Sequence, residues 1–375
     1  MGKMVYKSFK DEVRLSRLGM GNMRLPMKTD EPGAPIDYEA AKKIIDRAME
    51  AGVNYYDTAY IYHGGESEVF TGRALKDYPR DSYYVADKFN FQADPDFEAQ
   101  FAEQLKRLDM EYIDFYLLHG VQDWFADDLI KSGCIEYFDR LKKEGKIRYF
   151  GFSFHGTPEL LKRMLGSYPF DFVQIQLNYY DWFYGEAKAL YDILDEVKIP
   201  VMVMEPVHGG MLADLGEKAN ALLKDAAPDK SVASWAVRWV MGLPQVQVVL
   251  SGMSDPGQLE DNVRTASEAD RLSEEELRVL KKACGIVRAG VSVPCTKCRY
   301  CTPNCPMGLN IPLLLSYYND AKMDGPWRLS NLASAAEGKL PSACVGCGAC
   351  TSHCPQSFDI PKYMRELAEM MEKKE

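Results

Sequence analysis

From residue 37 to residue 289 the chain alternates short apolar runs with longer amphipathic stretches. In the amphipathic stretches apolar residues recur at helical spacing, as do Phe97, Phe101 and Leu105, which predicts helices with one buried face. The short runs are almost wholly apolar, as in parallel strands covered on both faces. With one earlier run added, the predicted strands are Arg17–Met20, Val53–Asp57, Tyr83–Lys88, Ile113–His119, Tyr149–Phe154, Phe172–Asn178, Pro200–Pro206 and Val246–Gly252.

Local signals at the ends of the amphipathic stretches support their assignment as helices. Asp37 is a typical N-cap for a helix over Tyr38–Ala51, and Gly52 stands where helices commonly end. Asp94-Pro95 is expected to open a helix that runs to Leu108. Ser273-x-x-Glu276 is a capping box that starts a further helix leading out of this region.

Eight strands in regular βα alternation over roughly 250 residues have the size and rhythm of a TIM (β/α)8 barrel. An open, doubly wound sheet is the competing α/β architecture. No G-x-G-x-x-G follows a strand near the start of the chain, so the barrel is favoured.

The predicted strands end in polar side chains. In a barrel, chemistry collects at the carboxyl ends of the strands, although a single polar residue there is equally typical of an ordinary strand terminus. The residues in these positions are Asp57, Lys88, His119, Ser153, Gln174 with Asn178, Glu205, and Ser251-Gly252.

Two cysteine runs of identical spacing, C-x-x-C-x-x-C-x-x-x-C-P, lie near the C-terminus. This spacing is typical of [4Fe–4S] ligation, in which three cysteines bind one cluster and the fourth binds the other. The two predicted ligand sets are Cys295, Cys298, Cys301 and Cys354, and Cys344, Cys347, Cys350 and Cys305.

Zinc and disulfide alternatives fit these runs poorly. Structural zinc sites use four ligands, usually as two separated pairs, and disulfide frameworks belong to small secreted chains. The remaining two of the ten cysteines, Cys134 and Cys284, lie in apolar helical patterns and are expected to be buried.

The region around the cysteine runs is expected to form a small helical ferredoxin-like domain over residues 290–375, after a barrel over residues 1–289. Predicted helices span Ile311–Met323, Trp327–Glu337 and Pro361–Lys374. Crossed ligation would join the two halves of this domain, so losing a cluster should unfold much of it.

Composition limits the partners and the cellular compartment that we expect for this chain. The net charge is −10, so no basic footprint points to nucleic acid. The N-terminus lacks an apolar secretory segment and a myristoylation signal, and no apolar run is long enough to cross a bilayer. We expect a cytoplasmic protein in a reducing compartment, without nucleic-acid or membrane partners.

The strand-end residues also resemble a known family. Asp57-Thr58-Ala59-Tyr60-Ile61-Tyr62, then Lys88, then Leu117-Leu118-His119 resemble the catalytic tetrad of the aldo-keto reductases, and the likeness runs from about Arg14 to Asn262. With its cysteine runs, the whole chain resembles the ferredoxin-fused branch of that family. The resemblance implies an NAD(P)-dependent oxidoreductase acting on a small-molecule carbonyl or alcohol.

The resemblance assigns a role to each member of the tetrad. Tyr62 would be the general acid that protonates the substrate oxygen. Lys88 would lower the pKa of the Tyr62 phenol, which is ordinarily about 10, and Asp57 would keep Lys88 charged and oriented. His119 would hydrogen-bond the substrate carbonyl, and the nicotinamide would supply the hydride.

The resemblance also implies the residues that bind the cofactor. Ser153 and Gln174 match the family's holders of the nicotinamide amide. The other matches are Gly21, Gly209, Gly210, Gly252, Ser254, Gln258 and Asn262. Phe154, Met204 and Gln258 depart from residues common in the family, so NADP and NAD both remain open.

The substrate and the use of the clusters stay open as well. Aromatic residues in two rim loops could line a substrate pocket or a seam against the second domain. These are Trp124, Phe125, Tyr179, Tyr180, Trp182, Phe183 and Tyr184.

A hydride carries two electrons and a cluster one, and the sequence shows no flavin fingerprint. Three hypotheses follow: a cluster-linked oxidoreductase that exchanges electrons with the barrel or with an external ferredoxin or flavoprotein, a carbonyl reductase with structural clusters, or a nicotinamide or redox-sensing binding module. The intact tetrad favours the first two.

Overall fold

The structure of the chain is a computed structural model that describes residues 3–10, 13–29, 33–268, 271–290, 292–324, 326–329 and 332–372. Two compact units are present: residues 1–206 with 233–272, and residues 207–232 with 273–375. The second unit therefore takes in the segment after the seventh barrel strand, and the predicted division at residues 289 and 290 stays a prediction. In the described part of the chain, no helix combines the length and apolarity needed to cross a membrane.

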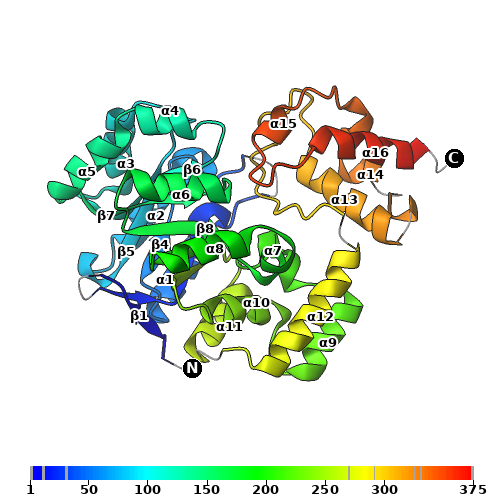
Figure 1. Cartoon of the computed structure of the whole chain (residues 1–375), viewed down its shortest axis with the longest axis horizontal. Coiled ribbons are helices and arrows are strands. Elements are labelled where there is room, and N and C mark those ends of the chain that lie inside the picture. Colours follow the sequence, from blue (N-terminus) through cyan, green and yellow to red (C-terminus); the bar gives the residue numbers. More distant parts are fainter. Residues whose placement is uncertain are drawn as a thin grey trace. The chain divides into compact units, whose positions relative to one another are not determined.

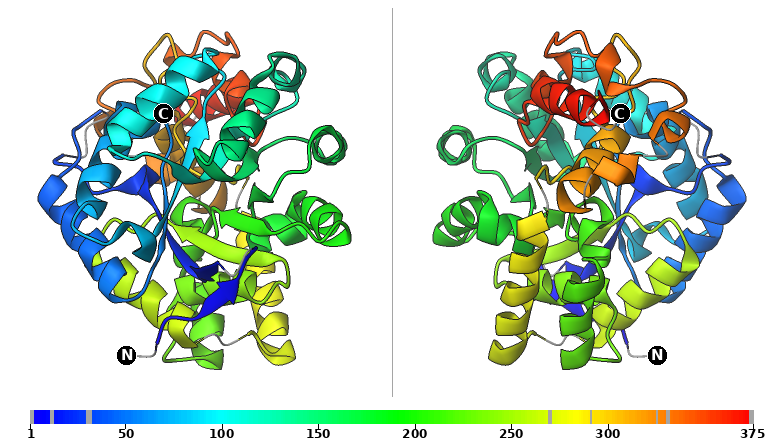
Figure 2. Two further views of the ribbon diagram at one scale, coloured as in Figure 1. Left: turned by 90° about the vertical axis from the view of Figure 1, so that its left-hand side faces the viewer. Right: turned by 90° about the vertical axis from the view of Figure 1, so that its right-hand side faces the viewer.

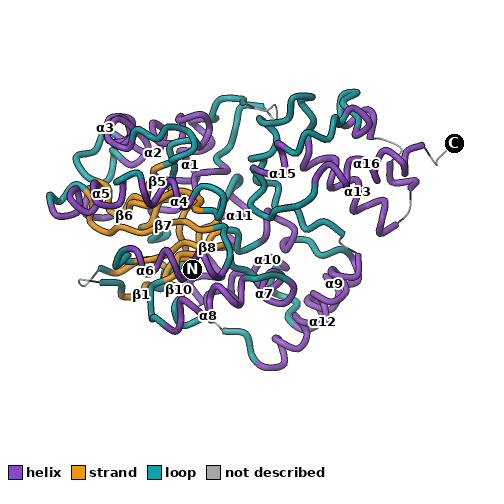
Figure 3. Tube along the Cα trace, turned by 45° about the horizontal axis from the view of Figure 1, so that its top comes forward, coloured by secondary structure: helices purple, strands orange, loops and turns teal. Residues whose placement is uncertain are grey.

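The first unit contains a closed barrel of eight parallel strands, which confirms the predicted architecture. Each strand pairs with the next along the chain, and β10 closes the barrel against β3. Helices surround the strands (Figure 3). The barrel strands are β3 (Leu18–Gly21), β4 (Tyr55–Asp57), β5 (Tyr84–Phe89), β6 (Ile113–Val121), β7 (Ile147–Phe154), β8 (Phe172–Gln176), β9 (Val201–Met204) and β10 (Val246–Ser251).

An N-terminal hairpin that the apolar pattern does not predict closes one end of the barrel (Figure 2). It pairs β1 (Tyr6–Ser8) with β2 (Arg14–Ser16). Val13 and Leu15 pack with barrel-interior residues such as Phe115, which lie toward the amino ends of the strands. The hairpin's short strands, Tyr-Lys-Ser and Arg-Leu-Ser, are mostly polar and so do not form apolar runs in the sequence. The hairpin leaves the carboxyl ends of the strands for the functional site.

The helices of the first unit alternate with the strands (Figure 1). Asp37 caps α1 by accepting a hydrogen bond from the Ala40 N–H at 3.1 Å, as predicted. The expectation that Asp94-Pro95 opens α3 is wrong, because Asp96 caps that helix by accepting from Ala99 N–H. The helices are α1 (Tyr38–Glu50), α2 (Glu66–Leu75), α3 (Phe97–Leu108), α4 (Ala126–Lys131), α5 (Cys134–Lys143), α6 (Pro158–Ser167), α7 (Tyr179–Tyr184), α8 (Ala187–Glu196), α10 (Val232–Met241) and α11 (Pro256–Glu268).

The described part of the second unit is built from helices and loops, as predicted. The capping box at Ser273 and Glu276 is formed, with the Glu276 N–H donating to Ser273 Oγ. The α9 and α12 helices lie side by side (Figure 2). The helices are α9 (Glu217–Ala226), α12 (Glu274–Gly290), α13 (Ile311–Asp324), η5 (Pro326–Leu329), α14 (Leu332–Ala335), η6 (Pro341–Ala343), α15 (Ala349–Ser352) and α16 (Ile360–Glu372).

One helix prediction in this unit is wrong. In the described residues of the expected α-helix over Trp327–Glu337, η5 is a 3-10 helix and α14 is an α-helix that ends at Ala335. Residues 330 and 331, between these two elements, lie outside the described residues.

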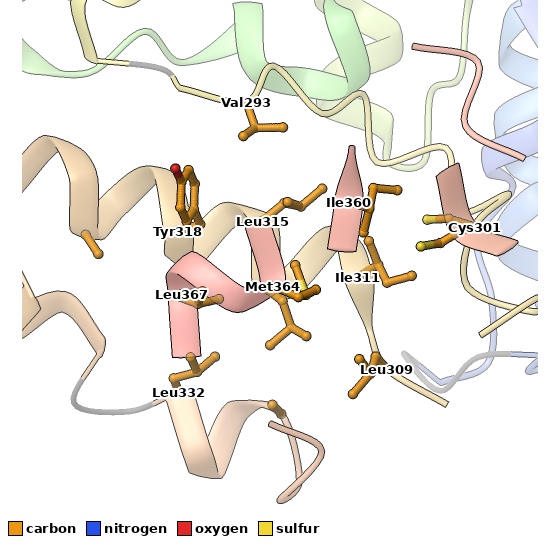
Figure 4. Packing of buried hydrophobic residues seen from close by; sticks show 14 of the residues in the cluster. Val293, Cys301, Leu309, Ile311, Leu315, Tyr318, Leu332, Ile360, Met364 and Leu367 are labelled. Atoms are coloured by element: carbon orange, nitrogen blue, oxygen red, sulfur yellow. The ribbon is translucent and has the colours of Figure 1, made fainter. Parts of the chain in front are cut away.

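The core of the second unit joins two helices to the cysteine loops (Figure 4). Leu315 of α13 and Met364 of α16 are fully or almost fully buried, and Cys301 and Cys350 belong to the same buried cluster. Two of the predicted ligands are therefore part of the hydrophobic core itself. The two remaining cysteines, Cys134 and Cys284, are buried as predicted.

Candidate active site and cluster sites

A buried ion pair lies at the carboxyl ends of β4 and β5. Lys88 Nζ lies 2.6 Å from Asp57 Oδ1 and donates to the Thr58 carbonyl at 2.5 Å. Lys88 is fully buried and Asp57 is 3% exposed. Burial raises the pKa of Asp57, and the charge and hydrogen bond of Lys88 oppose that rise. A buried ammonium needs such acceptors to stay charged.

Tyr62 and His119 lie next to this pair. Lys88 Nζ is 4.8 Å from the centroid of the Tyr62 ring, and the Tyr62 and His119 rings meet edge to face with centroids 5.9 Å apart. The structure thus brings together all four residues of the predicted tetrad.

The backbone after Tyr62 explains how that side chain is placed. Tyr62 begins η2 (Tyr62–Gly65), in which His63, Gly64 and Gly65 have φ values of 50°, 64° and 94°. Glycine adopts such left-handed backbone without steric cost. A side chain at Gly65 would also meet the Arg107 guanidinium. The turn therefore depends on its two glycines to return the chain from the rim into α2.

His119 is neutral near physiological pH. Burial above all, and then the neighbouring Lys88 and His155, hold its pKa well below the ordinary value. His119 Nδ1 lies 3.2 Å from Asn90 Nδ2. Asn90, directly after β5, was not predicted as a site residue, although its place just past a strand end was a readable signal.

Ser153 and Gln174 occupy neighbouring strands, paired in register between β7 and β8. Ser153 Oγ accepts from the Gly120 N–H at 2.7 Å, which leaves its hydroxyl hydrogen able to donate. Gln174 is 2% exposed, and its Oε1 is a buried oxygen without a hydrogen-bond partner. Such an oxygen is costly unless a ligand donates to it. The pair therefore fits a carboxamide such as that of nicotinamide.

A second group of predicted cofactor residues gathers where β3 and β10 end. Ser254 Oγ donates to the Arg24 carbonyl at 2.8 Å, and an added Cβ at Gly252 would lie 3.0 Å from Arg24. The Asn262 amide donates to Ser251 Oγ. Gly21 lies beside Ser251 and Gly252.

The loop before α11 lies next to a cation, Arg24, that was not predicted. Gln258 Oε1 accepts from the Ser254 N–H, so two predicted residues are bonded to each other. Arg24 adds a guanidinium that lies 3.7 Å from Glu205. It follows β3 in a segment without apolar periodicity, so the sequence pattern gave no signal for it.

Gly209 and Gly210 belong to the second unit and differ in their surroundings. A Cβ on Gly209 would lie 1.9 Å from the Thr296 carbonyl, whereas Gly210 faces open space. His208 Nε2 donates to the Pro294 carbonyl at 2.7 Å. Gly209 is thus required by close packing against the segment that carries a predicted cluster ligand. Its predicted contact with a cofactor stays a prediction.

The cysteines associate in the predicted crossed sets. Burial first, and then Cys298, Cys295 and Cys354, raise the pKa of Cys301 to about 12, so these four lie within electrostatic reach of one another. The Lys297 N–H donates to Cys295 Sγ at 3.4 Å, a contact of the kind that tunes clusters.

The second set lines a single cavity. Cys305, Cys344, Cys347 and Cys350 line this small pocket together with apolar residues such as Leu309 and Ile360. No group of three or more His, Cys, Asp or Glu side chains in the described ranges converges on a single metal ion. Each predicted set brings four cysteines close together, as the four thiolate ligands of a [4Fe–4S] cluster require.

Comparison with known proteins agrees with this geometry. A sequence profile of the Aldo/keto reductase family matches residues 17–284, which is more than half of the 375-residue chain. The chain belongs to the aldo/keto reductase family. A 4Fe-4S dicluster domain profile matches residues 294–358, which contain both cysteine runs.

Individual members of the family are moderately similar. Uncharacterized oxidoreductase YqkF of Bacillus subtilis is 28% identical over 72% of this chain and 93% of its own length. NADH-specific methylglyoxal reductase of Escherichia coli is 25% identical over 67% of this chain and 90% of its own. The structure of the Bacillus halodurans aldo-keto reductase AKR11C1, in its holo form, aligns with a TM-score of 0.62 at 29% identity, covering 75% of this chain and 96% of that one.

Proposed function

We propose that this member of the aldo/keto reductase family reduces the carbonyl group of a small molecule with NAD(P)H, or oxidises the corresponding alcohol, with Tyr62 as the general acid. The observation that carries the proposal is the fully buried Lys88, held by Asp57 2.6 Å away and 4.8 Å from the Tyr62 ring. A buried cation in this place has a chemical use, because it stabilises the phenolate that remains when Tyr62 gives up its proton.

Each side chain then has one task in the reaction. When bound, the reduced nicotinamide supplies the hydride that the carbonyl carbon accepts. Tyr62 donates its phenolic proton to the carbonyl oxygen, so an alcohol and oxidised nicotinamide result. Lys88 stabilises the phenolate until solvent returns the proton, and Asp57 keeps Lys88 charged and in place. Neutral His119 donates a hydrogen bond to the substrate oxygen and fixes its orientation.

The cofactor would be bound through two groups of residues. Ser153 and Gln174 would hold the carboxamide, where the unpartnered Gln174 Oε1 awaits a donor. The adenosine end would lie by Gly252 and Ser254, next to Arg24. Because the E. coli relative is named for NADH and Arg24 offers a cation for a phosphate, both NAD(H) and NADP(H) are proposed cofactors.

A substitution at Tyr62 tests this proposal. Tyr62→Phe keeps the ring and removes only the acid, so kcat for aldehyde reduction should fall about 10²–10⁴-fold, while nicotinamide binding, followed by quenching of protein fluorescence, persists. Tyr60→Phe is the matched control, because the Tyr60 hydroxyl is engaged with Glu103. Unchanged turnover in Tyr62→Phe would show that the acid has been misassigned.

We propose in addition that the cysteine sets hold two [4Fe–4S] clusters and exchange electrons with an external ferredoxin or flavoprotein that carries an acidic face. Cys347 is exposed, and beside it Val345 and Met307 are 63% and 41% exposed. Exposed apolar side chains around an accessible cluster suit a transient protein contact.

Charge indicates the kind of partner. The cysteine-bearing segments 292–310 and 338–358 contain Lys297, Arg299 and Lys339 but no Asp or Glu, in a chain of net charge −10. A Cβ added at Gly308, next to Met307, would lie 3.4 Å from Lys339 Nζ. A basic, partly apolar surface next to a cluster is complementary to an acidic one-electron carrier.

A further inference from the structure

We infer that Asn90 is a positioning residue that fixes the tautomer of His119, so that the Nε2–H faces the substrate oxygen. The inference rests on the proposed carbonyl chemistry and extends it to a residue outside the tetrad. It follows from hydrogen bonds around Asn90 that leave its side-chain amide a single orientation.

The side-chain oxygen of Asn90 is fixed first. Asn90 Oδ1 accepts from the backbone N–H groups of Gln92 at 3.1 Å and Ala93 at 2.9 Å. A flipped amide would turn its NH2 group toward these two donors and lose both bonds. The oxygen therefore faces the loop, and the NH2 group faces His119.

The backbone of Asn90 is held as firmly as its side chain. Gln100, a fully buried residue of α3, accepts from the Asn90 N–H at 2.6 Å and donates from Nε2 to the Asn90 and Asp94 carbonyls. Buried amide pairs of this kind rigidify the segment that they join. Helix α3 thus holds the loop after β5 at a fixed position relative to β6.

The proton position on His119 follows from this orientation. Asn90 Nδ2 can only donate, so His119 Nδ1, 3.2 Å away, must accept. An uncharged imidazole that accepts at Nδ1 carries its hydrogen on Nε2. Nε2 is then the donor for a carbonyl oxygen. In the opposite tautomer Nε2 would present a lone pair to that oxygen and repel it.

The neighbours of His119 favour the uncharged ring. The titratable groups that face it in the described structure are Lys88, His155 and Tyr62. None of these is an anion that would stabilise an imidazolium. Burial lowers the pKa of His155 to about 4, so that ring is also neutral.

The substitution Asn90→Asp distinguishes an effect on the His119 tautomer from an effect on folding. One carboxylate oxygen can still accept from Gln92 and Ala93, while the other offers His119 an acceptor in place of a donor. His119 must then place a proton on Nδ1, either by losing Nε2–H or by becoming an imidazolium. Gln92→Ala is the matched control, because its side chain is exposed and only its backbone N–H is used.

The experiment is ¹⁵N NMR of the histidine rings in the full, cluster-loaded chain. His119 is identified among the five histidines by the signal that His119→Gln removes. We expect Nε2 to be protonated and Nδ1 bare from pH 5.5 to 8 in the native chain and in Gln92→Ala. In Asn90→Asp the Nδ1 signal should become that of a protonated nitrogen, with kcat/KM at least about tenfold lower and a new inflection in its pH profile.

A protonated Nδ1 in the native chain would overturn the inference, even if no variant folds. Unchanged His119 shifts and an unchanged pH profile in a folded Asn90→Asp would overturn it as well. Failure of the proposed function is a separate result: full turnover in Tyr62→Phe would remove the reaction but leave the NMR signature of His119 in place.

Discussion

At the residue scale, the sequence predicts the candidate catalytic residues at the barrel mouth better than the residues around them. Asp57, Lys88 and His119 could be found because each ends an apolar run, and strand ends converge in a barrel. Asn90 also follows a strand end and could have been found by the same criterion, whereas Arg24 could not. Their contacts depend on the exact path of loops, which apolar periodicity does not encode.

A buried carboxyl next to Lys88 gives a prediction about stability and pH. Asp87 is fully buried, and burial, followed by the nearby Glu68, raises its pKa well above the ordinary value. In the unfolded chain Asp87 ionises near pH 4. Its contribution to stability is therefore fully present below about pH 4 and is lost as the pH rises through the higher pKa of the folded state.

Asp87→Asn should remove this pH dependence. The asparagine oxygen can still accept from the Lys88 N–H, as Asp87 Oδ1 does at 2.8 Å. We expect the free energy of unfolding of the barrel to rise by about 1 kcal/mol or more at pH 8, with little gain at pH 4. Urea unfolding followed by tryptophan fluorescence at both pH values measures the difference, and an equal effect at the two values would contradict the assignment.

At the element scale, the eight barrel strands could be predicted, because they lie in apolar runs that alternate with amphipathic stretches. The hairpin of β1 and β2 could not, because its short strands consist mostly of polar residues. The start of α3 was misplaced since Asp94 and Asp96 are both plausible caps, and only the folded turn shows that Asp96 accepts from the helix.

The loop after β9 carries a prediction of its own. Gly209→Ala would place a Cβ 1.9 Å from the Thr296 carbonyl, next to Cys295. Gly210→Ala is the matched control, because Gly210 also has a positive φ but faces open space. Both changes add backbone strain of about 1–2 kcal/mol, but only Gly209→Ala also displaces residues 294–296.

Cluster content distinguishes these two variants. Gly209→Ala should be purified with a markedly lower ratio of iron to protein than Gly210→Ala, and its cluster absorbance should bleach faster in air. Equal iron content in both variants would show that the loop is not needed to hold the ligand segment.

At the scale of the whole molecule, the chain combines an aldo/keto reductase barrel with a second unit that contains a 4Fe-4S dicluster domain. The sequence predicts both parts because their functional residues have recognisable positions. In the barrel these residues stand at strand ends, and in the second unit the cysteines recur at the spacing typical of cluster ligands. It does not predict that residues 207–232, between β9 and α10, group with the second unit. That grouping depends on packing between segments far apart in the sequence.

The basic and apolar surface beside Cys347 predicts how an electron carrier binds. Lys339→Glu and Val345→Asp should each raise the KM for a reduced, acidic two-cluster ferredoxin severalfold, and the effect of Lys339→Glu should shrink at high salt. Lys188→Glu, on the exposed face of α8, is the charge-matched control. Reduction by methyl viologen should be unchanged in all three. A KM that is equal in all variants would place the contact elsewhere.

The central claim of the proposed cluster-linked function is that the clusters exchange electrons with the bound nicotinamide as well as with the external carrier. Its most direct test is the visible absorbance of the chain, purified without oxygen and shown by iron and sulfide assay to hold two clusters, after addition of NADPH and then NADH. One hydride carries two electrons, one for each cluster, so we predict bleaching of the clusters as the nicotinamide is oxidised and its proton is released. Unchanged absorbance, while an aldehyde is still reduced, would contradict the claim and leave a carbonyl reductase whose clusters only hold the fold.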